Sequence, residues 1–221
     1  MGLRLAAVRR LRSEEGFTLA EMTVTVMLLL VVMTIFLTIT TSVQRAVARN
    51  TGRSSSNDQA RLAVEELDRE IRSGNVLYDP ALENDPANGI YPNMSLRIYT
   101  QTNADSRNPG NQCVQWRILP AGSLLGSDEL QRRAWGVDWQ NDGSVTDWRV
   151  VAYNILNNDA PTRLAFVQDN SLAFGGRIIN ITIVANADPA SGRNVVISDS
   201  VTGRNTEYGY PNNICSAIPP Y

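Results

Sequence analysis

A single carboxylate, Glu21, stands directly before an apolar run, Met22 to Val43, in which no residue is charged. A charge at the end of a membrane-length segment is costly, so such residues are usually paired and functional. The arginines that precede this segment are Arg4, Arg9, Arg10 and Arg12. The position of Glu21 at the end of this segment therefore indicates a functional role for its carboxylate.

The basic residues are unusual, because all 20 are arginine and the chain contains neither lysine nor histidine. The absence of these two residue types excludes sites that need an imidazole base or metal ligand, a lysine Schiff base or a phosphate-loop lysine. A net charge of −2 and a pI near 5.3 give no sign of a nucleic-acid-binding surface. We predict that the protein is not an enzyme and has no nucleic-acid partner.

Two cysteines, Cys113 and Cys215, lie far apart in the sequence and beyond the apolar run. Two isolated cysteines without histidine cannot build a structural zinc site by themselves. The alternatives are a disulfide formed in an oxidising compartment and two free thiols, and we favour the disulfide. Such a bridge would close a loop of about 100 residues and tie the C-terminal tail to the rest of the fold.

One loop has the spacing of a calcium site. Its candidate oxygen ligands are Asp138, Gln140, Asp142 and Asp147. The first three, followed by Gly143, match positions 1, 3, 5 and 6 of a calcium loop. Position 12 is Arg149 where a glutamate is expected, so Asp147 would have to substitute for it. We favour an ordinary turn between strands, and we predict no cofactor other than this calcium candidate.

The tryptophans also gather in one region: Trp116, Trp135, Trp139 and Trp148. Exposed tryptophans could bind a sugar or a partner protein. Tryptophans at strand positions of a single β-domain are more often core residues, and we favour that interpretation.

The apolar run has the length of about 20 residues that a membrane-spanning helix needs, and it exceeds the 7–15 residues of a signal-peptide core. Threonines within it can bond back to helix carbonyls without ending the helix. The arginines before the span predict a cytoplasmic N-terminus and a head outside. The simplest alternative is a plain single-pass anchor. Residues 44–57 are rich in poor helix formers, which predicts a bend or a locally melted turn.

Helical periodicity then returns, with Ala60, Val64, Leu67 and Ile71 on one face. Gly74 follows as a predicted helix C-cap. This stripe must pack on something, either a sheet of the same chain or a neighbouring helix.

The rest of the chain alternates between turn signals and short segments of strand-like pattern. The predicted strands cover residues 94–100, 112–119, 130–137, 149–155, 162–167, 177–185 and 194–201. Residues 78–93 and 103–111 are predicted loops, and the last two strands are predicted to form a hairpin. The predicted fold class is α+β, with a long N-terminal helix on a C-terminal antiparallel sheet.

The segment Gly16-Phe17-Thr18-Leu19-Ala20-Glu21, followed by the apolar run, resembles the class III signal of type IV pilins and type II secretion pseudopilins. The amphipathic segment 59–72 is similar to the helix of the larger minor components, the PilW-like pilins and J-type pseudopilins. The absence of a proline between Phe17 and Val43 favours a minor subunit. The glutamate at position 21 argues against a K-type pseudopilin.

The resemblance implies that prepilin peptidase cuts after Gly16 and methylates the new terminal Phe17. It also implies that the Phe17 amine pairs with Glu21 of a neighbouring subunit. The partners would be other pilin or pseudopilin subunits and the inner-membrane assembly platform. The subunit would cross the inner or cytoplasmic membrane once and then enter a filament.

The implied domains are a leader (1–16), a helix (17–74, membrane-spanning over about 22–43) and a β-rich head (75–221). The alternative in another class is an uncleaved, membrane-anchored β-domain that binds a sugar, DNA or a protein.

Overall fold

The computed structural model describes residues 16–88, 90–100, 110–119, 128–157, 163–171, 175–188, 193–203, 210–211 and 213–220. Residues 1–15 of the predicted leader (1–16) and most of the predicted loop 103–111 lie outside these residues. The chain divides into two compact units, Met1–Ala48 and Arg49–Tyr221. A single helix, α1 (Leu19–Ser73), contributes its first part to one unit and its last part to the other.

The described residues of the second unit, which we call the head from here on, form the end of α1 and eight strands. The strands are β1 (Gly74–Leu77), β2 (Ser95–Thr100), β3 (Gln112–Leu119), β4 (Asp128–Gly136), β5 (Arg149–Ile155), β6 (Phe166–Asp169), β7 (Ile178–Asp188) and β8 (Arg193–Thr202). Short helices are η1 (Pro80–Leu82), η2 (Pro86–Asn88) and α2 (Trp139–Asp142).

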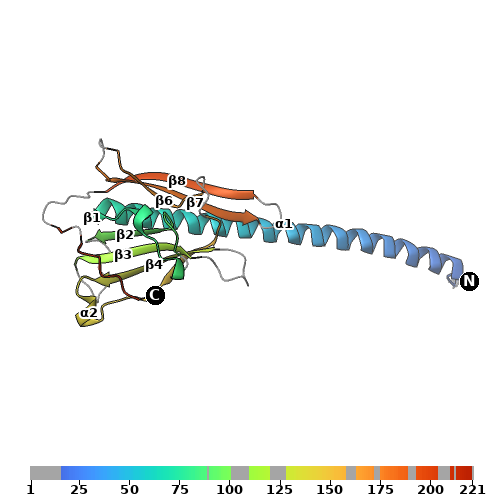
Figure 1. Cartoon of the computed structure of the whole chain (residues 1–221). Coiled ribbons are helices and arrows are strands. Elements are labelled where there is room, and N and C mark those ends of the chain that lie inside the picture. Colours follow the sequence, from blue (N-terminus) through green and yellow to red (C-terminus); the bar gives the residue numbers. More distant parts are fainter. Residues whose placement is uncertain are drawn as a thin grey trace, which may run out of the picture. The chain divides into compact units, whose positions relative to one another are not determined.

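All strand pairs in the head are antiparallel, and the order is β1-β2-β3-β4-β5-β7-β6, with β8 paired to the other edge of β7. Figure 1 shows β2, β3 and β4 on one side of the C-terminal part of α1 and β6, β7 and β8 on the other. The sheet therefore curls around the helix. The α+β prediction is confirmed.

The core of the head forms between α1 and the inner face of this sheet. The predicted stripe Ala60, Val64, Leu67 and Ile71 is buried, with no side chain more than 7 % exposed. These residues share one apolar cluster with Leu96 and Ile98 of β2, Trp116 of β3, and Ile179 and Ile181 of β7. Of the two alternatives for the stripe, the structure therefore shows packing on a sheet of the same chain.

Two expectations about the helix are wrong. Residues 44–57 are helical throughout, so the predicted locally melted turn is absent. Gly74 does follow the last helical residue, but its φ is not positive, so it is not a left-handed C-cap, and β1 begins at this residue. A Cβ at Gly74 would lie 2.8 Å from Cγ2 of Ile98 and 3.0 Å from the carbonyl oxygen of Ile71. Glycine is needed here for close packing between helix and sheet.

The strand predictions agree well with the structure. The ranges of β3 and β5 match, the other predicted strands overlap observed ones, and the β7–β8 hairpin is present. The four-residue strand β1 was not predicted. It lies between a helix end and a loop rich in proline and asparagine, and it is too short to show a two-residue period.

Candidate functional site

The N-terminus of α1 is closed by a capping box formed by Thr18 and Glu21. The Thr18 hydroxyl accepts from the Glu21 backbone N–H at 3.3 Å, and Glu21 Oε2 accepts from the Thr18 N–H at 3.0 Å. The Thr18 hydroxyl donates to the same Oε2 at 3.0 Å. A threonine followed three residues later by glutamate satisfies two of the free donors of a helix start in this way. Glu21 is thus fixed at the first turn, and Gly16 and Phe17 precede the helix.

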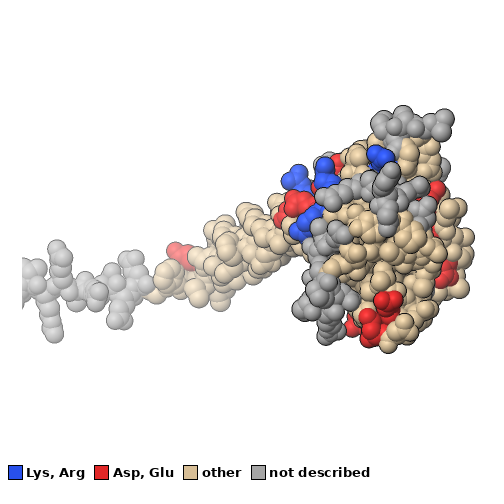
Figure 2. Space-filling view, turned by 90° about the vertical axis from the view of Figure 1, so that its left-hand side faces the viewer, with Lys and Arg blue, Asp and Glu red and all other residues tan. Residues whose placement is uncertain are grey.

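The first unit presents an apolar surface. From Phe17 to Val47 the large apolar side chains are 51–83 % exposed. Figure 2 shows this part of the helix almost without charged atoms. The hydroxyls of Thr23, Thr34, Thr38 and Thr40 donate to carbonyls three or four residues earlier, as predicted. By length and composition, α1 is able to cross a membrane. The hydroxyls of these threonines are satisfied within the helix, which suits an apolar solvent.

Buried charge joins the helix to the sheet in the head. Glu70 of α1 is fully buried, and its carboxylate accepts from Trp116 Nε1 at 2.5 Å. Its other oxygen accepts from Arg132 Nε and Nη2 at 2.8 and 2.6 Å. One turn earlier, Glu66 pairs with Arg149 at 2.7 Å. These hydrogen bonds cross from α1 to β3, β4 and β5, so the charges fix the helix on the sheet.

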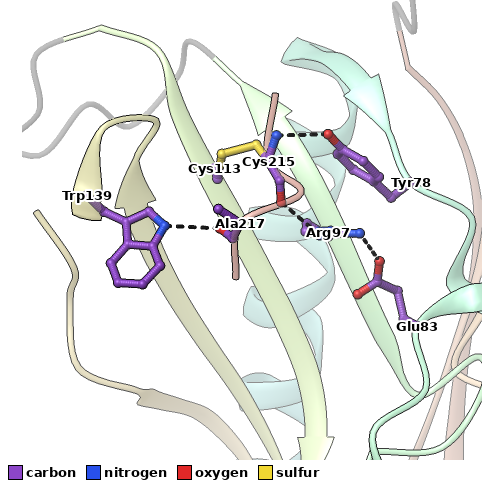
Figure 3. The surroundings of a disulfide bond; sticks show 7 residues. All are labelled: Tyr78, Glu83, Arg97, Cys113, Trp139, Cys215 and Ala217. Carbon is purple, nitrogen blue, oxygen red and sulfur yellow. Dashed lines mark hydrogen bonds and ion pairs between the residues drawn. A yellow bond between two sulfur atoms is a disulfide. The ribbon is translucent and has the colours of Figure 1, made fainter. Parts of the chain in front are cut away.

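The predicted disulfide between Cys113 and Cys215 is present, with 5.8 Å between the Cα atoms. It ties the C-terminal segment 213–220, which we call the tail, to β3 (Figure 3). Trp139 Nε1 donates to the Ala217 carbonyl at 3.1 Å. Arg133 of β4 donates to the carbonyls of Pro219 and Pro220. Side chains of α2 and β4 therefore hold the tail, whose described residues pair with no strand.

Arg97 of β2 joins the tail to a second segment. Its Nη1 donates to the Cys215 carbonyl at 2.7 Å, and its Nη2 pairs with Glu83 Oε1 at 2.6 Å (Figure 3). Its guanidinium lies over the ring of Tyr78, whose hydroxyl accepts from the Cys215 N–H at 2.9 Å. Burial raises the pKa of Glu83 above its usual value, and Arg97 opposes this shift. Burial also raises the pKa of the Tyr78 hydroxyl.

The tryptophans do not form an exposed array. Trp116 and Trp135 are 0 % exposed. Trp148 lies beneath the guanidinium groups of Arg117 and Arg133, at 3.7 and 4.4 Å from its centroid. The favoured interpretation, in which tryptophans belong to the packing of the β-domain, fits this placement.

The calcium candidate forms a tight turn. Asp138 occupies the N-cap position of α2, Gln140 lies within that helix, and Gly143 follows it in the left-handed conformation with φ 67°. Asp142 Oδ1 accepts from the Ser144 N–H at 2.9 Å, and hydrogen bonds from Ser144 lower the pKa of Asp142. Asp147 is exposed. Within the described residues, no three acidic, histidine or cysteine side chains converge into a group that could hold a metal ion.

The sequence analysis missed two groups of residues, the helix cap at Thr18 and the charged residues Glu70 and Arg97. The cap could have been found, because threonine followed three residues later by glutamate is the signature of a capping box. The roles of Glu70 and Arg97 had no signal, since Trp116 lies 46 residues from Glu70 and Cys215 lies 118 residues from Arg97.

No model of a known protein family, no curated protein and no solved structure matches this chain. The architecture itself is pilin-like: an apolar N-terminal helix that continues into a head, where it packs on an antiparallel sheet with a C-terminal disulfide. The disulfide indicates an extracytoplasmic head, because such bonds persist in oxidising compartments.

Proposed function

We propose that the chain is a minor pilin or pseudopilin, a non-enzymatic subunit of a type IV pilus or type II secretion-like filament. Prepilin peptidase cuts it between Gly16 and Phe17 and methylates the new terminus. Before assembly it spans the inner or cytoplasmic membrane once, with the head outside. It then joins other subunits through its helix, with the help of the membrane assembly platform.

One observation carries this proposal: the carboxylate of Glu21 is fixed at the N-terminal end of an exposed segment, Met22 to Val43, that has no charged residue. Cleavage after Gly16 would create a cation at Phe17, four residues away in sequence. In an apolar surrounding, an isolated amine and an isolated carboxylate are both costly, and pairing them between neighbouring subunits offsets the cost. A wrong axial register would leave both unpaired, so the pair favours one register.

The capping box allows the pairing role of Glu21 to be separated from its structural role. Glutamine also closes a capping box, so Glu21→Gln keeps the helix start and removes only the charge. Thr18→Ala removes the cap and keeps the charge, whereas Glu21→Val removes both the cap and the charge. We expect cleavage to persist in all three. Incorporation into filaments should fall in Glu21→Gln and Glu21→Val and fall less in Thr18→Ala. Normal incorporation of Glu21→Gln would show that the charge is not used.

Processing is tested by mass spectrometry of the membrane-extracted protein. We expect an N-terminus at methylated Phe17. An intact N-terminus upstream of Gly16 would contradict the proposal and favour the uncleaved, anchored binding domain.

A further inference from the structure

A pocket of about 420 Å³ lies in the head between α1 and the sheet. Its polar lining is Ser55, Ser56 and Gln59 of α1, Glu129 of β4, and Tyr153 and Asn154 of β5. These residues come from one helix and two strands, so rigid elements hold the pocket. The proposed filament role uses neither the cavity nor its lining.

The backbone beside this pocket is irregular. Asn154 has φ 60°, a left-handed conformation within a strand that few residues other than glycine adopt. The β4–β5 register shifts twice between Asp128 and Gln131, and β5 pairs with β7 only through Ile155 and Ala185. Uncommon backbone conformations cluster at ligand-binding sites, because the surrounding structure must maintain them. At this end, next to the cavity, β5 does not form a regular hydrogen-bonded ladder with its neighbouring strands.

The chemistry of the lining is that of a polyol site. Serine hydroxyls, asparagine and glutamine amides and the tyrosine phenol each both donate and accept hydrogen bonds, as sugar hydroxyls do. Only Glu129 is charged, and its Oε2 already accepts from Gln131 Nε2 at 2.8 Å. Gln59 is positioned by contacts of 3.4 Å with the Tyr153 N–H and the Ser55 hydroxyl. A single carboxylate among neutral groups suits neither a phosphate nor a bound metal ion.

Tyr153 supplies the remaining element of such a site. It is 49 % exposed and lines the pocket, so it offers an aromatic surface next to the polar groups. An aromatic ring packs against the C–H face of a sugar while the hydroxyls bond to the polar lining. We propose that this pocket binds a hexose unit of a glycan.

The test uses the full chain in phosphatidylcholine nanodiscs and saturation-transfer NMR, with the methyl glycosides of glucose, galactose, mannose and N-acetylglucosamine as probes. We expect at least one glycoside to bind saturably, with a Kd on the order of millimolar for so small a ligand. Tyr153→Ala should weaken this binding about three- to tenfold, and Tyr153→Phe should retain it. Tyr91→Ala is the matched control, because Tyr91 is 47 % exposed and is not among the lining residues.

A second pair of variants tests Asn154. Asn154→Gly and Asn93→Gly both place glycine at a left-handed residue, with φ of 60° and 65°. Neither should disturb folding, which circular dichroism checks, and only Asn154→Gly should weaken glycoside binding. The proposal is overturned if none of the four glycosides binds, or if binding survives both Tyr153→Ala and Asn154→Gly. Equal losses in the Tyr91 and Asn93 controls would also overturn it. None of these outcomes depends on whether the chain enters a filament.

Discussion

Replacement of Glu70 by alanine should destabilise the head more than any surface change on the same helix. The carboxylate is fully buried and accepts three hydrogen bonds, from Trp116 Nε1 and from two nitrogens of Arg132. Glu70→Ala leaves the Arg132 side chain, only 12 % exposed, without its closest anion. Breaking a buried pair from one side costs about 3–5 kcal/mol. Because Arg132 keeps Glu66 at 3.4 Å, we expect a loss of about 3–4 kcal/mol in the free energy of unfolding.

Glu66 is the matched control, since it lies one turn away on α1 and also contacts Arg132. Its side chain is 20 % exposed, and its closest partner, Arg149, is 56 % exposed. Because Arg149 is largely exposed, water screens this pair, and pairs screened in this way contribute roughly 0–1 kcal/mol, so Glu66→Ala should cost no more than about 1 kcal/mol.

The assay is guanidinium unfolding of the full chain in detergent micelles, followed by tryptophan fluorescence. All four tryptophans lie in the head, so the signal reports the head alone. The slope of unfolding free energy against denaturant should stay constant, so the midpoint reports stability directly. Equal losses for Glu70→Ala and Glu66→Ala would refute the claim that the buried carboxylate fixes the helix on the sheet.

Three further predictions follow from the described geometry. Replacing Cys113 and Cys215 together by serine should lower the free energy of unfolding by about 2–4 kcal/mol, measured by guanidinium denaturation beside the oxidised protein; an unchanged midpoint would contradict this. Because burial raises the pKa of Glu83, the native state holds that proton more tightly, and its contribution to stability falls as pH rises above the usual 4.5. The difference in melting temperature, wild type minus Glu83→Gln, should therefore decrease between pH 4 and 7, and an increase would show the opposite sign. Gly52→Ala, whose Cβ meets nothing within 4 Å, should stabilise the helix by about 0.5–1 kcal/mol, whereas Gly74→Ala should destabilise the head; denaturation of the two variants side by side checks the contrast.

Much of the fold could be predicted because it rests on local periodicity. The stripe from Ala60 to Ile71 reflects burial of one helix face, which imposes a helical period on the sequence. β3 alternates apolar and polar side chains, although seven of its eight residues are buried. The helical state of residues 44–57 could not be predicted from propensity, because weak helix formers such as Gly52 and Ser54 only lower helix stability. They do not forbid the helix when both flanks are helical.

The candidate sites likewise divide into those that could be identified from the sequence and those that could not. The segment Thr18 to Glu21 and the two cysteines could be identified because their chemistry depends on residue type and near neighbours. The pocket around Tyr153 and Asn154 could not, because β4, β5 and α1 meet there only after the sheet has formed. Sequence patterns carry no direct record of which distant strands become neighbours.

The direct passage from α1 into β1 has a mechanical consequence. Ser73 is the last helical residue and Gly74 the first strand residue, so no loop absorbs extension between them. The Ser73 hydroxyl lies 2.8 Å from that of Thr100 on β2, which anchors this junction to the sheet. A tensile force along this end of the helix therefore loads the β1–β2 ladder and the buried helix stripe at once. Without slack at this point, the head should resist such a pull as a single stiff body up to the force at which the helix detaches from the sheet.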